Sequence, residues 1–434
     1  MLGWLFAAVT GCTRPVPPPP VILLTVDTLR YDHLNQQHTP NILSILDDSV
    51  HFTQAFSPIS VTGPAFVTLM TGLDVSSHGV HQNLFRRGRT LKRGTPTLAS
   101  ILRKKQYSTA AFLSGFTLQP RLGLNAGFQT YDFRWQKRRW GDRTAELAVN
   151  WLREQSSSFF MWYHTYDAHG PWERWGGPCS TSAIDAEQQR RIPLYQRLGE
   201  CTESKEYARR YGEAVKFADK NVGLILNELK TLGKYQDSWI VITADHGESF
   251  TERELWFDHG TTPYIEQLQV PLLIKAPSSM NWSGEDERLV SLSDVLPTIL
   301  DGLELESPAV DGFSLRNSRS VREHLVGESS HCKSADVLTC APTGPKGKWF
   351  SIRSKTETLI NAGDQWRYYD RSSDPLELRP QLVGSNPILK QHLQKTLATR
   401  MRQITTIPSH NSQLQPSAES ELLKQLGYVD HEEH

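Results

Sequence analysis

The sequence predicts an α/β protein in which a central, mostly parallel sheet is sandwiched by helices, with a smaller α+β subdomain at the C-terminus. Three short apolar segments, residues 21–26, 159–166 and 238–244, support the sheet. Short apolar runs bounded by polar or turn residues are typical of strands that are covered on both faces. The segments 211–230 and 291–300 indicate helices that pack on this sheet, because their apolar residues recur near helical spacing.

Each of the three apolar segments ends in a carboxylate. Asp27, Asp167 and Asp245 stand at these ends, and His246 follows Asp245 directly. Ligands bind at the carboxyl edge of a parallel sheet, so we expect these side chains to converge there. Carboxylates and a histidine gathered in one place need a cation, which predicts a divalent metal ion: Ca, Mn, Mg or Zn. The alternative is that each aspartate only caps its own loop.

The N-terminal residues suggest an exported protein. The first twelve are mostly apolar and too few to cross a bilayer as a helix. Residues 9–12, Val-Thr-Gly-Cys, resemble the end of a bacterial lipoprotein signal, which implies removal of residues 1–11 and acylation of Cys12. Residues 12–20 would then be a lipid anchor and a Pro-rich tether at the membrane, and the resemblance implies the periplasmic face of the outer membrane. A disordered apolar terminus is the alternative.

Four further cysteines form two close pairs in polar, loop-like sequence. In an exported protein this pattern predicts one disulfide between Cys179 and Cys201 and another between Cys332 and Cys340. A zinc site is the rival interpretation, but the spacings are not the short ones of metal fingers.

The charge balance argues against a nucleic-acid partner. Lysine plus arginine equals aspartate plus glutamate, with 47 of each, so no net field attracts a polyanion. The oligomeric state stays open.

Residues 57–72 carry the predicted nucleophile. Pro64 suits the first turn of a helix and Gly72 suits its end. Thr62 would then lie just before a helix N-terminus, where free N–H groups and the helix dipole favour an anionic ester. A metal ion can activate a hydroxyl as a nucleophile. The alternative is that Thr62 is only an N-cap.

Several motifs, in order along nearly the whole chain, resemble the sulfatase family of the alkaline phosphatase superfamily. They are residues 26–34, 39–42, 62–72, 78–80, 122–128, 166–171, 244–248, 258–260, 270–274, 369–370 and 374–375. The resemblance implies a metal held by Asp27, Thr62, Asp245 and His246. It also implies an anionic ester as the substrate.

This chain departs from the family pattern at the catalytic position. True sulfatases oxidise a Cys or Ser to formylglycine, and an Arg follows four residues later; here these positions are Thr62 and Phe66. Thr28 stands where many sulfatases have a second metal-binding Asp. The resemblance therefore favours the branches that hydrolyse phosphate esters through a covalent Thr62 intermediate, with sulfate esters still open. The alternatives are a phosphotransferase acting on an envelope glycan or lipid, and a catalytically inactive binding lipoprotein.

Three further residues match family positions near the substrate. The resemblance assigns Asp167, His169 and His259 either to a second metal or to the substrate, with His169 or His259 protonating the leaving group. It also divides the chain into a catalytic domain at 21–305, a C-terminal subdomain with antiparallel strands at 306–404, and a polar tail with a short helix at 405–434.

Overall fold

The computed structural model describes residues 17–83, 90–133, 139–176, 179, 186–199, 201, 203–254, 256–330, 348–362, 365–381, 387, 391 and 394–396. Cys12, Cys332 and Cys340 lie outside these residues, as do the predicted signal peptide and the polar tail. Within the described ranges, every helix is too short or too polar to span a bilayer.

The central sheet confirms the predicted fold class. It has eight strands in the order β4-β3-β5-β1-β6-β7-β2-β8, and β7 alone runs antiparallel to its neighbours. The strands are β1 Val21–Val26, β2 Val50–Phe56, β3 Ser108–Leu113, β4 Thr130–Asp132, β5 Phe159–Thr165, β6 Trp239–Thr243, β7 Leu272–Lys275 and β8 Gly284–Ser291. The three predicted strands β5, β1 and β6 are direct neighbours in the middle of the sheet and are buried along their whole length.

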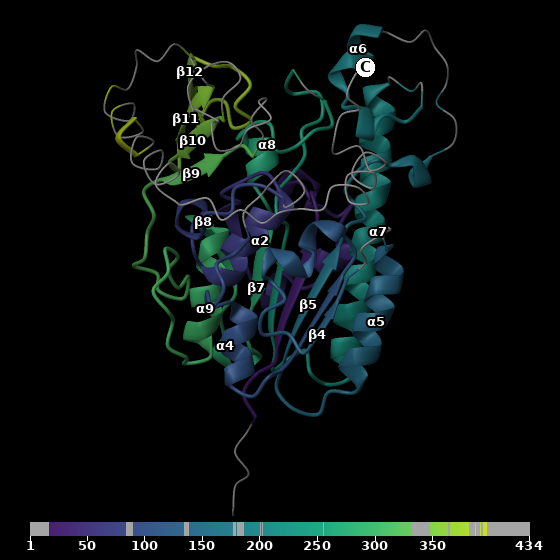
Figure 1. Cartoon of the computed structure of the whole chain (residues 1–434), viewed down its shortest axis with the longest axis vertical. Helices are drawn as coiled ribbons and strands as arrows, with labels where there is room; N and C mark the ends of the chain where they lie inside the picture. The colour runs from purple at the N-terminus through teal and green to yellow at the C-terminus, as the bar shows by residue number, and fades with distance from the viewer. Residues whose placement is uncertain are drawn as a thin grey trace, which may run out of the picture.

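Helices cover both faces of this sheet (Figure 1). α5 (Gly141–Arg153) and α7 (Ser204–Thr231) pack together on one side, while α2 (Thr62–Thr71), α4 (Leu98–Lys104) and α9 (Val295–Gly302) lie on the other. The shorter helices are α1 Pro40–Leu43, α3 Val75–His78, α6 Ala186–Arg191 and α8 Ile265–Leu268.

The predicted helices are present with shifted ends. α7 begins seven residues before the predicted start, and the segment 291–300 opens as a 3-10 turn before α9 begins. α2 begins at Thr62 and ends, as predicted, at Gly72 with a positive φ of 70°. Thr62 therefore lies in the first turn of the helix.

A separate four-stranded antiparallel sheet forms the smaller C-terminal unit, at the upper left in Figure 1. Its strands are β9 Leu325–Glu328, β10 Phe350–Arg353, β11 Glu357–Ala362 and β12 Gln365–Asp370, in the order β12-β11-β10-β9. β9 contacts the larger unit through a bridge from Glu328 to Ile59, three residues before Thr62.

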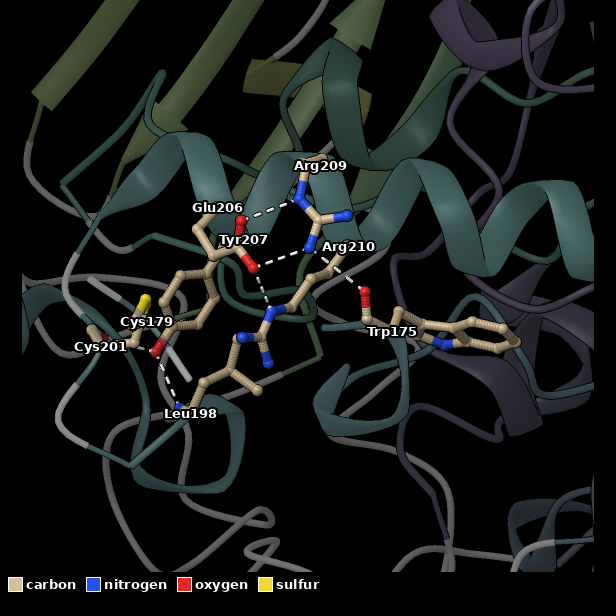
Figure 2. The surroundings of a disulfide bond; sticks show 8 residues. All are labelled: Trp175, Cys179, Leu198, Cys201, Glu206, Tyr207, Arg209 and Arg210. Atoms are coloured by element: carbon tan, nitrogen blue, oxygen red, sulfur yellow. Dashed lines mark hydrogen bonds and ion pairs between the residues drawn. A yellow bond between two sulfur atoms is a disulfide. The ribbon is translucent and has the colours of Figure 1, made fainter. Parts of the chain in front are cut away.

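Cys179 and Cys201 form the predicted disulfide, with their Cα atoms 5.4 Å apart. Figure 2 shows how the start of α7 is tied to this link. The Tyr207 hydroxyl donates to the Cys201 carbonyl at 3.0 Å and accepts from the Leu198 N–H at 2.9 Å.

Candidate active site

Asp27, Asp245 and His246 converge as predicted at the carboxyl edge of the sheet. β1 and β6 are paired from Val21 to Thr25, so the residues that follow them leave the sheet side by side. One ligand atom from each of the three side chains lies within 4.8 Å of the others, and all three residues are fully buried.

The contacts of Asp245 and His246 fit a cation. Asp245 Oδ1 accepts from the backbone N–H groups of Thr28 and His246, at 3.1 and 3.0 Å. Asp245 Oδ2 and His246 Nε2 lie 3.4 Å apart, and among the described residues neither atom has a hydrogen-bond partner. The carbonyl of Gly247 lies 2.8 Å from His246 Nδ1, which places the ring proton on Nδ1 and turns the Nε2 lone pair toward the cluster. A divalent ion would satisfy these atoms.

Thr62 faces this cluster. Its hydroxyl donates to Asp27 Oδ2 at 3.4 Å, and its side chain is buried. Val61 occupies the N-cap position of α2, so the alternative in which Thr62 is only an N-cap is wrong. The next N–H, that of Gly63, donates to the Asn83 side chain at 2.7 Å.

Thr28 has an unusual backbone beside the cluster. Its φ is 53°, a left-handed conformation that is strained for a β-branched residue. The Tyr211 hydroxyl holds the Thr28 carbonyl at 2.8 Å while the Thr28 N–H points at Asp245. The backbone of this residue thus helps to orient the Asp245 carboxylate.

His164, inside β5, is a site residue that the sequence analysis missed. Its Nε2 lies 3.2 Å from Asp27 Oδ2, and its Nδ1 lies 3.0 Å from the Thr25 hydroxyl. Burial lowers the pKa of His164 to about 4, so the imidazole is neutral near pH 7. A histidine within a fully buried apolar strand was the available signal, because such a side chain needs polar partners.

Asp167 makes hydrogen bonds to α5 and α7 and to its own strand end. Both of its oxygens accept from the Gly141 N–H at the start of α5, at 3.0 and 3.1 Å. Oδ2 also accepts from the Thr165 hydroxyl at 2.5 Å and from Asn221 Nδ2 at 3.4 Å. These contacts make Asp167 an anchor for a helix N-terminus.

His259 lies between His246 and His169 in a row of ring contacts. The His259 ring centre is 4.6 Å from that of His246 and 4.9 Å from that of His169. Glu248 Oε2 lies 3.2 Å from His259 Nδ1. Burial raises the pKa of Glu248 to about 8 and lowers the pKa of His259, so the proton that this pair shares resides on the carboxyl near pH 7.

Buried carboxylates, a buried imidazole and a hydroxyl at a helix start define a candidate cation site with an adjacent hydroxyl, at the carboxyl edge of a sheet covered on both faces. The sulfatase family model matches residues 19–305. The chain belongs to the sulfatase family.

Curated proteins with two different descriptions are similar to this chain in sequence. The chain is 23% identical over 375 residues to the inner membrane protein YejM of Salmonella typhimurium, covering 83% of this chain and 53% of that protein. It is 28% identical over 179 residues to N-acetylglucosamine-6-O-sulfatase of Bacteroides thetaiotaomicron, covering 40% and 32%. The chain thus spans less than two thirds of the length of these curated relatives.

Solved structures share the fold. The phosphonate monoester hydrolase of Agrobacterium radiobacter superposes with a TM-score of 0.70 at 20% identity, covering 89% of this chain and 96% of that one. A protein solved with its substrate D-glucosamine-2-N,6-O-disulfate also gives 0.70, at 18% identity and covering 89% and 98%.

Proposed function

We propose that this protein is a metal-dependent hydrolase that cleaves phosphate esters through a covalent ester on Thr62. The observation that carries the proposal is the Thr62 hydroxyl, 3.4 Å from Asp27 in the predicted metal cluster. Oxidation of threonine gives a ketone, so this residue cannot become the formylglycine aldehyde. An unmodified hydroxyl attacking phosphorus is the chemistry that remains.

Asp27, Asp245 and His246 would hold the divalent ion. When bound, that ion supplies a Lewis acid that stabilises negative charge on the nucleophile and on the ester. Thr62 Oγ1 forms a bond to phosphorus, the bond to the leaving oxygen breaks, and the hydroxyl proton passes to the Asp27 carboxylate that Thr62 already faces. Water then attacks phosphorus and gives a proton back to the histidine that protonated the leaving oxygen; the bond from phosphorus to Thr62 Oγ1 breaks, phosphate leaves, and Thr62 recovers its proton from Asp27.

His169 and His259 are placed to give a proton to the leaving oxygen. Both rings are buried; His259 adjoins His246, and His169 adjoins His259. Glu248 contacts His259 and can replace a proton that this histidine gives up. Asp167, which the sequence assigned to a second metal or the substrate, has the positioning contacts described above.

Turnover on matched aryl substrates tests this function. The purified full chain is assayed on a phosphate monoester, a phosphodiester and a sulfate ester, with Mn, Zn, Ca or Mg and after chelation. Thr62→Ala should lower metal-dependent phosphoester turnover by on the order of a thousandfold or more, because the attacking oxygen is lost. Thr71→Ala is the matched control, since it removes a buried hydroxyl from the same helix that bonds the Val67 carbonyl at 2.6 Å.

The outcomes separate the alternatives. Turnover of the sulfate ester alone would refute the Thr62 mechanism. Phospho-group transfer to added glycan or lipid acceptors, without release of phosphate, would identify a transferase. Full metal binding without turnover or transfer would leave a binding lipoprotein.

We also propose that a lipid on Cys12 anchors the protein in the periplasm, at the periplasmic face of the outer membrane. In Figure 1 the described chain enters at the end of the sheet away from the C-terminal unit. The carbonyls of Pro18 and Pro19 accept hydrogen bonds from Ser158 and Tyr107, which precede β5 and β3. The tether therefore joins the sheet at its amino edge, and the candidate site lies at the opposite, carboxyl edge. Cys12→Ser should move the protein from the membrane to the soluble fraction and abolish labelling by palmitate; retention and labelling would refute the anchor.

A further inference from the structure

His164 is joined to a chain of polar side chains that ends at the predicted metal cluster. Thr25 and His164 are directly opposite each other on the neighbouring strands β1 and β5. Trp162 Nε1 donates to Thr25 Oγ1 at 3.0 Å, Thr25 Oγ1 lies 3.0 Å from His164 Nδ1, and His164 Nε2 lies 3.2 Å from Asp27 Oδ2. All four residues are buried. The same Asp27 oxygen accepts from Thr62.

The hydrogens available to these side chains favour one arrangement of their contacts. The indole N–H can only donate, so Thr25 must accept from Trp162 and has one hydrogen of its own to give. That hydrogen can go to the Tyr163 carbonyl at 3.0 Å or to His164 Nδ1. In the first case, the lone pair of His164 Nε2 faces a carboxylate oxygen. In the second case, His164 Nε2 carries its hydrogen 3.2 Å from the Asp27 carboxylate, a charge-complementary contact whose angle falls short of a hydrogen bond in the described part of the chain.

The nucleophile helix packs on the same imidazole. The ring of Phe66 meets His164 edge to face at 4.9 Å and lies 5.0 Å from Trp162. Phe66 is fully buried and stands at the position where the family resemblance expects an arginine. An apolar ring at this place excludes water from the His164–Asp27 contact and strengthens it electrostatically.

We propose that His164 is a positioning residue that holds the Asp27 carboxylate in its metal-binding orientation, with Thr25 and Trp162 fixing the tautomer. The inference rests on the proposed metal site. It assigns His164 to Asp27 and not to the metal itself. Partners that orient metal-binding side chains in this way typically contribute 10- to 100-fold to metal affinity.

Titration calorimetry of the full chain with Mn²⁺ tests the inference, because metal affinity is measured without turnover. His164→Leu should weaken Mn²⁺ binding by roughly 10- to 100-fold. His164→Gln should bind within about threefold of the wild type, since its amide N–H can occupy the place of Nε2–H. His164→Asn can keep the contact with Thr25 but cannot reach Asp27, and should resemble the leucine variant.

Thr109→Val is the matched control. It removes a buried strand hydroxyl that bonds the Gly127 carbonyl at 2.7 Å on β3, outside the chain of contacts to Asp27. Its Mn²⁺ affinity should equal that of the wild type even where its stability falls.

The results divide cleanly. Unchanged affinity in His164→Leu overturns the inference and leaves the proposed function intact. Binding by His164→Gln as weak as by His164→Leu also overturns it, and assigns the imidazole to the metal directly. If His164→Leu does not fold, the comparison of Gln with Asn decides, and equal affinities refute the positioning role. A wild type that binds none of Mn²⁺, Zn²⁺, Ca²⁺ or Mg²⁺ refutes the proposed function and this inference together.

Discussion

Replacing Asp167 should destabilise the protein without weakening its metal site. Asp167→Ala removes the acceptor of the Gly141 N–H and of the Thr165 hydroxyl, both of which are buried. A buried donor left without a partner costs about 1–3 kcal/mol. Two such donors predict a loss of about 3–5 kcal/mol, a large part of the roughly 5–15 kcal/mol by which a domain is stable.

Two companion variants sharpen this prediction. Asp167→Asn keeps one oxygen for the Gly141 N–H and should lose only about 1–2 kcal/mol. Gly141→Ala leaves the carboxylate unchanged, but its added Cβ would clash with Asp167 Oδ2, Thr165 Oγ1 and Asn221 Nδ2. It should therefore destabilise the protein through the same contact.

Urea unfolding at pH 7, followed by tryptophan fluorescence, measures the loss, and calorimetry with Mn²⁺ measures the site. We expect metal affinity within about threefold of the wild type, a difference below ~1 kcal/mol. If Asp167→Asn kept full stability but lost metal binding or turnover, the reasoning would be refuted, and Asp167 would be a ligand as the family resemblance allows.

Two further predictions concern stability. Cys179 and Cys201 close a loop with a sequence separation of 22, so replacing both by Ser should cost about 3 kcal/mol, measured by urea unfolding; an unchanged midpoint would contradict this. Burial alone would raise the pKa of Glu328, but its ion pair with Lys348 at 2.6 Å and a neighbouring imidazole hold that pKa well below its usual range. Because the pKa is lowered in the folded protein, the ionised carboxylate stabilises the fold at pH values above its unfolded pKa near 4.5. This stabilisation is lost progressively as the pH falls from there toward the lower pKa of the folded state. Glu328→Gln should therefore cost about 3–5 kcal/mol at pH 7, and less at pH 3, because a buried charge loses its partner. A loss that does not shrink between pH 7 and pH 3 would refute the assignment.

The central part of the fold and of the site could be predicted from local sequence. β1, β5 and β6 are short, apolar and buried along their whole length, so each was visible without knowledge of its neighbours. Asp27 and Asp245 then converge because their strands are adjacent. Asp167 follows an equally central strand, yet its carboxylate turns to Gly141. The backbone after a strand decides where a side chain points, and strand order alone does not contain that information.

Contacts between distant segments could not be predicted. Thr25 and His164 are 139 residues apart, and only the register of β1 against β5 sets them opposite each other. β9 has four residues and no apolar periodicity of its own; its pairing with β10 defines it. In both cases the determining interaction is a tertiary one.

Two of the three departures from the family pattern, at Thr28 and Phe66, have structural roles beside the predicted metal cluster. Thr28 gives its N–H to Asp245 from a strained backbone, and Phe66 covers the imidazole that faces Asp27. Each supports a predicted metal-binding carboxylate. Meanwhile Asp245 Oδ2 and His246 Nε2 are buried without a partner among the described residues, at a cost of about 1–3 kcal/mol each. A chain that had given up its cation would gain stability by replacing either side chain, so their retention together with this support favours a working metal site over a decayed one.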